Sequence, residues 1–287
     1  KYNCQGVPHL LFLDSKGNEV DRIIGFIPPT EYLLRIQDII NRRNTLNDYL
    51  SKFNDGNNSE ELLASIALKY KNRKEDQKAV EFYKILLNKY PNSNSKYYKE
   101  GEFFLASYNF KTNDENALNE YILMNPNSLF NLDAYRNMVH HYANNQQIDK
   151  EILVYKQMLK AFPNDPNALN SYAWRMAEIE KDLEIALEKV KKAIMLTVKD
   201  PNMQANIIDT EAEVLWKLKR FDEAIKSIEK ALLIEPPTPR LYSLNKTIIL
   251  SSEKFFLASF PVSYGQASST NITLSTNSNV SLITSKV

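Results

Sequence analysis

Few residues of this sequence are of the types that carry catalytic chemistry, and they do not assemble into a catalytic set. Cys4 is the only cysteine among the 287 residues, whereas reversible disulfide exchange needs a low-pKa thiolate paired with a second thiol. A lone cysteine of this kind more often serves as a small core residue than as a nucleophile. We therefore expect that the chain as it stands is not an enzyme and that it has no catalytic residues.

The histidines are the next residues that could do chemistry, by binding a metal. They are His9, His140 and His141, and adjacent residues of a helix point about 100° apart, so His140 and His141 cannot chelate one ion together. The sequence has no H-E-x-x-H pattern, no nucleophile elbow and no glycine-rich phosphate loop. We expect no metal and no cofactor.

The charge balance restricts the partners. There are 36 basic and 35 acidic residues, a net charge of +1. Because no basic excess is present to neutralise phosphates, we expect no nucleic-acid partner. No apolar run approaches the ~20 residues that a membrane-spanning helix needs, so we expect no membrane span.

A repeated helical unit would position whatever binding residues the chain has. Pro91, Pro126, Pro163, Pro201 and Pro236 each follow an amphipathic stretch, at spacings of 35, 37, 38 and 35 residues. That period is typical of a helix–turn–helix repeat that ends in proline. Only 6 residues are glycine, which also favours helices. The sequence predicts a mainly α-helical solenoid of about five helix pairs.

Small and aromatic residues recur inside these units. Alanine at the crossing of two antiparallel helices allows close approach, and aromatic side chains fill the space between successive pairs. The first and last units carry them at Ala67, Tyr70, Ala79, Tyr83, Ala212, Leu215, Ala224, Ile228 and Ala231. Asp165-Pro166 and Asp200-Pro201 predict helix N-caps followed by proline at the first helical position.

Residues 59–236 resemble the tetratricopeptide repeat (TPR) family in five copies. The middle copies depart from its pattern, with Gly101 where leucine is usual, Asp114 and Glu151 where alanine is usual, and an extra residue in the inner turn of the fourth copy. The resemblance implies a groove, lined by the first helix of each pair, that binds a protein or peptide.

The family pattern also implies which residues face that groove. These candidates are of types that binding surfaces use, namely Lys99, Phe103, Arg136, His140, Asn170, Trp174, Asp209, Glu213 and Trp216. Trp174 and Trp216 can equally fill core between helices. Some family members clamp a terminal carboxylate with lysine and asparagine, but Ala64 and Leu68 occupy the matching positions, so we do not expect that ligand.

Residues 1–43 follow a different pattern. Leu10–Leu13 and Val20–Phe26 read as two strands, and Pro28-Pro29 opens an amphipathic helix. The segment resembles the C-terminal part of a thioredoxin domain, through Lys1, Tyr2, Gly6, Pro8, Phe12, Gly17 and Gly25. The resemblance implies that Val7 and Pro8 form a peptide-binding loop with a cis-proline and that a Cys-x-x-Cys pair would lie upstream of Lys1.

The remaining segments complete the expected organisation. Residues 44–58 read as a linker with a helix, 237–260 as a capping helix, and 261–287 as a disordered tail rich in Ser, Thr and Asn. The chain starts in the middle of a pattern, so we expect it to be part of a longer protein. The resemblance to bacterial thioredoxin–repeat fusions leaves the periplasm, the wider cell envelope and the cytoplasm open.

These observations favour a protein-interaction scaffold attached to a truncated thioredoxin-like domain. The alternative is the C-terminal portion of a thiol–disulfide oxidoreductase, with a role in cell redox homeostasis, whose repeats recruit a substrate. A third hypothesis is a purely structural array that associates with itself.

Overall fold

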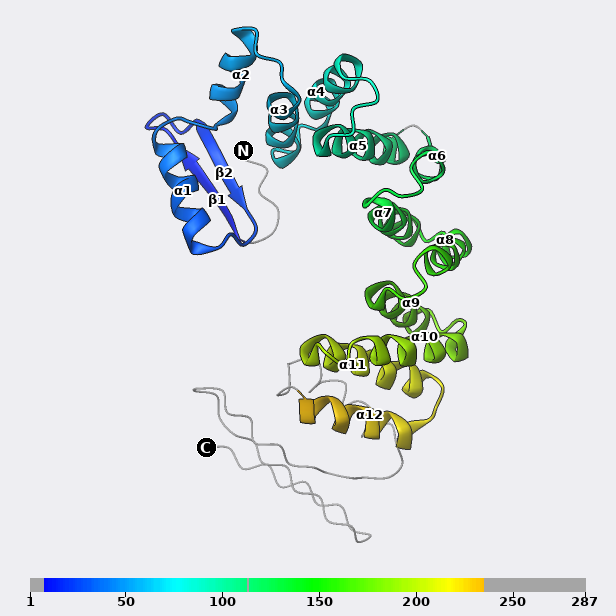
Figure 1. The fold of residues 1–287 in the computed structure, drawn as a ribbon. Helices are drawn as coiled ribbons and strands as arrows, with labels where there is room; N and C mark the ends of the chain where they lie inside the picture. The colour runs from blue at the N-terminus through cyan, green and yellow to red at the C-terminus, as the bar shows by residue number, and fades with distance from the viewer. Residues whose placement is uncertain (1–7, 113, 235–287) are drawn as a thin grey trace, which may run out of the picture. The chain divides into compact units, whose positions relative to one another are not determined.

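A computed structural model describes residues 8–112 and 114–234, which form twelve helices and one two-stranded sheet (Figure 1). The chain comprises two compact units, one ending at Val154 and the other beginning at Tyr155. The expected mainly helical fold is confirmed. Cys4, Val7 and the predicted capping helix and tail lie outside the described residues.

The N-terminal hairpin consists of β1 (His9–Leu13) and β2 (Glu19–Ile24), which pair antiparallel. Its turn is closed by the Asp14 carboxylate, which accepts the backbone N–H groups of Lys16 and Asn18 at 2.9 and 2.8 Å. Gly17 supplies the positive φ of 76° that this turn requires. The prediction that β2 extends to Phe26 was wrong, because Gly25 takes a φ of 80° and leaves Phe26 84% exposed.

Two short helices follow the hairpin. Helix α1 (Pro29–Ile40) begins with proline at its first position, as predicted, and packs Ile39 against Val20 and Ile23 of β2. Helix α2 (Leu46–Asn54) is capped by the Thr45 hydroxyl, which accepts the Asp48 N–H at 3.3 Å. The helix expected within residues 44–58 is therefore present.

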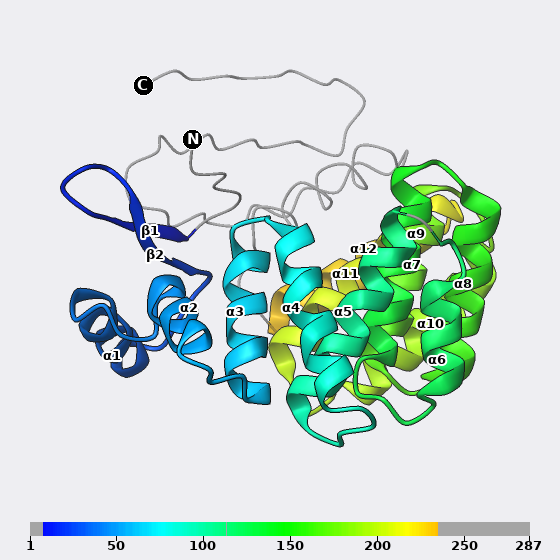
Figure 2. The same ribbon diagram turned by 90° about the horizontal axis from the view of Figure 1, so that it is seen from above.

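Ten further helices follow as five consecutive pairs, in agreement with the predicted repeat. The helices are α3 (Glu60–Asn72), α4 (Asp76–Lys89), α5 (Lys96–Thr112), α6 (Ala117–Met124), α7 (Asn131–Asn144), α8 (Ile148–Ala161), α9 (Pro166–Glu178), α10 (Leu183–Leu196), α11 (Pro201–Lys217) and α12 (Phe221–Ile234). In the first unit α3, α4 and α5 lie side by side (Figure 2). In the second, α9 packs on α10 and α11 on α12.

The turns inside the pairs are short and depend on left-handed residues. Three residues join α3 to α4, α7 to α8 and α11 to α12, and each turn holds one residue with positive φ: Lys74, Gln146 and Lys219. The turn between α9 and α10 has four residues and two left-handed positions, Glu180 and Asp182. The extra residue predicted for the fourth copy is thus accommodated by a second left-handed residue.

The expected packing of small and aromatic residues is confirmed. Ala67, Ala79, Ala212, Ala224 and Ala231 are each 0% exposed, and Tyr83 is also 0% exposed. The predicted caps are present as well. The carboxylate of Asp165 accepts the Ala168 N–H at 2.7 Å, and that of Asp200 accepts the Met203 N–H at 3.0 Å.

The departures from the repeat pattern have structural explanations. Gly101 is buried, and a Cβ there would lie 3.0 Å from side-chain atoms of both Tyr83 and Leu87, so α5 approaches α4 too closely for leucine. Glu151 occupies the small position of α8 and is 0% exposed. Asp114 does not occupy the small position of α6, because it lies in the preceding turn and Ala117 is the buried small residue.

Candidate functional site

The nine predicted groove residues all lie on the first helix of a pair. In the first unit, Lys99 and Phe103 lie on α5, and Arg136 and His140 lie on α7. In the second unit, two lie on α9 and three on α11: Asn170, Trp174, Asp209, Glu213 and Trp216. Each of the two units therefore contains its own group of predicted groove residues.

On α7, the two candidates are exposed and bonded to neighbours on their own helix. The Arg136 guanidinium lies 3.1 Å from the Asp133 carboxylate, and the His140 Nδ1 lies 2.9 Å from the Asn144 side-chain nitrogen. Surface pairs of this kind contribute little to stability. The Arg136 and His140 side chains therefore lie at the surface and are not part of the core.

The candidates on α9 and α11 are less accessible. Trp174 and Trp216 are half-buried. This exposure lies between that of a core side chain and that of a freely exposed groove side chain, the two roles that the sequence left open. The Lys217 ammonium lies 4.9 Å from the centroid of the Trp216 ring. Asp209 is only 3% exposed, and the buried Oδ1 of Asn170 has no hydrogen-bond partner among the described residues.

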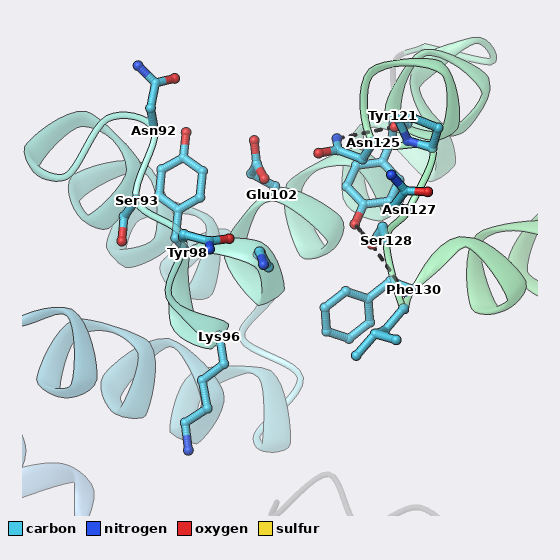
Figure 3. A pocket seen from close by; sticks show the side chains of 14 residues that line it. Asn92, Ser93, Lys96, Tyr98, Glu102, Tyr121, Asn125, Asn127, Ser128 and Phe130 are labelled. Atoms are coloured by element: carbon cyan, nitrogen blue, oxygen red, sulfur yellow. Dashed lines mark hydrogen bonds between the residues drawn. The ribbon is translucent and has the colours of Figure 1, made fainter.

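A cavity of about 610 Å³ in the first unit adds a site that the sequence did not single out (Figure 3). It lies where the start of α5 meets two connecting segments, residues 92–94 and 125–130. Its lining combines aromatic rings, amide groups, one carboxylate and two ammonium groups, from Asn92, Ser93, Asn94, Lys96, Tyr98, Lys99, Glu102, Tyr121, Asn125, Pro126, Asn127, Ser128, Leu129 and Phe130.

Of the predicted groove residues, Lys99 lines the cavity and Phe103 supports its wall. The Phe103 ring stacks on Phe130, with centroids 4.9 Å apart and ring planes 7° apart. It also lies 5.7 Å from the Tyr121 ring, centroid to centroid. The remaining lining residues were missed. Most belong to the segments between pairs, whereas Lys96, Tyr98 and Glu102 lie on α5 and Tyr121 lies on α6. A signal for the segments does exist, since Pro-Asn-Ser occurs at 91–93 and again at 126–128.

Hydrogen bonds fix the two connecting segments. The Tyr121 hydroxyl and the Ser128 hydroxyl lie 2.7 Å apart, and the buried Asn131 side chain donates to the Asn125 carbonyl at 2.8 Å. On the other side, the Ser95 hydroxyl accepts the Tyr98 N–H at 3.1 Å, which caps α5. These bonds hold the walls of the cavity in place.

Glu102 contributes the one carboxylate of the cavity lining. Within the described part of the chain its carboxylate makes neither a hydrogen bond nor a salt bridge. Burial raises the pKa of Glu102, and the positive charge of Lys99 opposes that effect. Figure 3 shows the carboxylate directed into the space between Tyr98 and Tyr121.

The arrangement suits recognition. The side chains around the cavity offer aromatic faces and hydrogen-bonding groups of the kind that orient a bound ligand. Among the described residues, no three His, Cys, Asp or Glu side chains are grouped as metal ligands. In the same part of the chain, no helix has the length and apolarity needed to cross a membrane.

Comparisons with known proteins find similar solved structures only. No family model matches the chain, and no curated protein matches it. The TPR protein YrrB, described as having an unusual peptide-binding site, is 16% identical over 69% of this chain and 97% of its own, with a TM-score of 0.44. A thermophilic TPR protein of Thermus thermophilus is 17% identical over 67% of this chain and all of its own, with a TM-score of 0.39.

A third similar structure consists of nearly identical TPR-like repeats from a kinesin light chain of Podosopora anserina. It is 14% identical over 60% of this chain and 92% of its own, with a TM-score of 0.43.

Proposed function

We propose that this chain is a protein-interaction module of the TPR type, which binds a segment of another protein along the first helices of its pairs. The observation that carries this proposal is the cavity at the start of α5, whose walls are held by internal hydrogen bonds while Glu102 is left without one. A polar group that the fold leaves unsatisfied in a concave site is available to a ligand.

Peptide binding fits this cavity better than binding of a nucleic acid. A phosphate backbone requires several cations, whereas the cavity holds one carboxylate and mostly neutral amides beside its two lysines. Tyrosine and phenylalanine at its walls are residues that dominate the energetics of protein interfaces. Leu129, which also lines the cavity, is 94% exposed and adds apolar surface to it.

Selection from a random peptide library displayed on phage, with the full chain immobilised, tests the proposal. Peptides that bind wild-type protein should lose about tenfold or more in affinity for Tyr98→Ala, because an aromatic wall of the site is removed. Tyr108→Ala is the matched control, since Tyr108 lies on the same helix outside the cavity. No enrichment, or equal losses in both variants that remain folded by circular dichroism, would refute the proposal.

For the N-terminal segment we infer a thioredoxin-like origin. The supporting features are the strand–strand–helix order and the Gly25 N–H, which donates to the Pro8 carbonyl at 2.9 Å. On this basis the oxidoreductase alternative stays a hypothesis about a longer parent chain. Sequencing the gene upstream of Lys1 tests it, because a parent without a Cys-x-x-Cys pair could not cycle a disulfide.

A further inference from the structure

We propose that the cavity at the start of α5 receives a lysine or arginine side chain of the bound peptide, and that Glu102 pairs with its positive charge. This inference rests on the proposed interaction function and specifies its ligand. It is carried by the unpaired carboxylate, the aromatic rings beside it and the placement of the two neighbouring lysines.

The carboxylate is the first element. Glu102 is half-buried and has no hydrogen bond or salt bridge within the described residues. Removing a carboxylate from water without a partner is unfavourable, and the upward shift of its pKa reflects that burial. An incoming ammonium or guanidinium group would supply the missing partner.

The aromatic rings are the second element. Figure 3 shows the Tyr98 and Tyr121 rings on either side of the space that the Glu102 carboxylate enters. A cation near the face of an aromatic ring is attracted by the ring's quadrupole. The Tyr121 ring is held in place by its hydroxyl contact with Ser128 and by packing against Phe103. A cationic side chain would therefore meet aromatic surface along its stem and a carboxylate at its tip.

The two lysines of the lining are the third element. The Lys96 ammonium lies 4.9 Å from the centroid of the Tyr97 ring, and in Figure 3 its side chain extends away from Glu102. Lys99 acts on Glu102 through its charge but forms no salt bridge with it in the described structure. Lys99 consequently opposes a cationic ligand, which gives its removal a predictable effect.

An anionic ligand is the competing occupant, and the geometry disfavours it. Such a ligand would have to approach the half-buried Glu102 carboxylate, where like charges repel. The amide side chains of the lining, such as those of Asn92 and Asn127, contain both acceptors and donors and do not select for negative charge. Lys99 would favour the anion, while Lys96, the other lysine of the lining, extends away from Glu102 (Figure 3).

Amide NMR titrations of the full chain with small probes test this assignment. The probes are n-butylammonium and ethylguanidinium, which mimic the two side chains, with n-butanol and butyrate as uncharged and anionic controls at constant ionic strength. We expect the two cations to shift the amides of residues 92–102 and 125–130, with weaker effects from both controls.

Three variants complete the experiment. Glu102→Gln should weaken cation binding about fivefold, and Lys99→Gln should strengthen it. Glu120→Gln removes an exposed carboxylate on α6 outside the cavity and should leave binding unchanged. Stronger shifts with butyrate than with butylammonium, or identical cation binding in Glu102→Gln and wild-type protein, would overturn the inference.

The peptide selection distinguishes this inference from the function on which it rests. Selected peptides that depend on Tyr98 but contain no essential Lys or Arg would overturn the cation assignment and leave the interaction function standing. Selection of no peptide at all would overturn the interaction function itself. Both would be supported by peptides that lose affinity for the wild-type protein when a single Lys or Arg is replaced. The Glu102→Gln variant should then bind the original and the replaced peptide equally.

Discussion

The Lys69 Nζ lies 2.6 Å from the Asp21 carboxylate, so an ion pair joins the first repeat helix, α3, to strand β2. The Asp21 side chain is 0% exposed and also pairs with Arg35 of α1. The Arg73 guanidinium at the end of α3 lies 3.1 Å from Glu19 and 3.9 Å from Asp21. The N-terminal segment is therefore anchored to the repeats through buried charges in addition to its small apolar core.

The anchoring carboxylate gives the first prediction. Asp21→Asn removes the carboxylate that pairs with Lys69 and Arg35 in a buried network, so the free energy of unfolding should fall by about 3 kcal/mol. Urea unfolding followed by circular dichroism measures this change. Asp55→Asn, at an exposed position, is the control and should change stability by less than about 0.5 kcal/mol. Equal stabilities for the two variants would contradict the anchoring role.

The raised pKa of Glu102 predicts a pH-dependent stability. A carboxyl group whose pKa is raised in the folded state favours folding below its ordinary pKa, 4.5, and this contribution is lost as pH rises through the folded-state value. Glu102→Gln should therefore be more stable than wild-type protein at neutral pH, with the difference shrinking on acidification. Thermal unfolding of both proteins, measured over about 4 pH units from roughly pH 3 to 7, gives this difference across the titration of a glutamate. A difference that grows toward low pH would contradict it.

The cap of α9 gives a prediction in the second unit. Asp165→Ala removes the acceptor of the Ala168 N–H and should cost about 1 kcal/mol of stability. Asp165→Asn keeps a capping oxygen and should differ from wild-type protein by only a few tenths of a kcal/mol. Chemical denaturation of the three proteins separates these cases. Equal losses in both variants would mean that the charge, and not the cap, is responsible.

The glycine of α5 gives a prediction about packing. Gly101→Leu introduces the residue usual at this repeat position, but its side chain would collide with Tyr83 and Leu87, so we expect a loss of about 2–3 kcal/mol. Ala161→Leu places the same side chain at an exposed helix position and should have little effect. Wild-type stability in Gly101→Leu would show that α4 and α5 separate easily.

The fold was largely predictable from the sequence because its signals are local. Proline ends a helix through its own backbone, and buried alanines such as Ala79 and Ala224 recur at one position of the second helices, except in α8, where Glu151 takes that place. The end of β2 was misjudged because the left-handed conformation of Gly25 outweighs the apolar character of Ile24 and Phe26.

The candidate site was harder to predict. Lys99 and Phe103 were identified through the repeat pattern, but Glu102 and Tyr121 line one cavity only because α5 and α6 approach one another in three dimensions. Periodicity along one helix carries no information about such an approach. The recurrence of Pro-Asn-Ser in both connecting segments was the one local signal available.

Mapping a selected peptide onto the amide NMR spectrum of the full chain tests the central claim most directly. We predict that residues 92–103 and 125–130 shift on titration and that these shifts are lost in Tyr98→Ala but retained in Tyr108→Ala. Shifts confined to the second helices of the pairs, α4 and α6, would contradict the account.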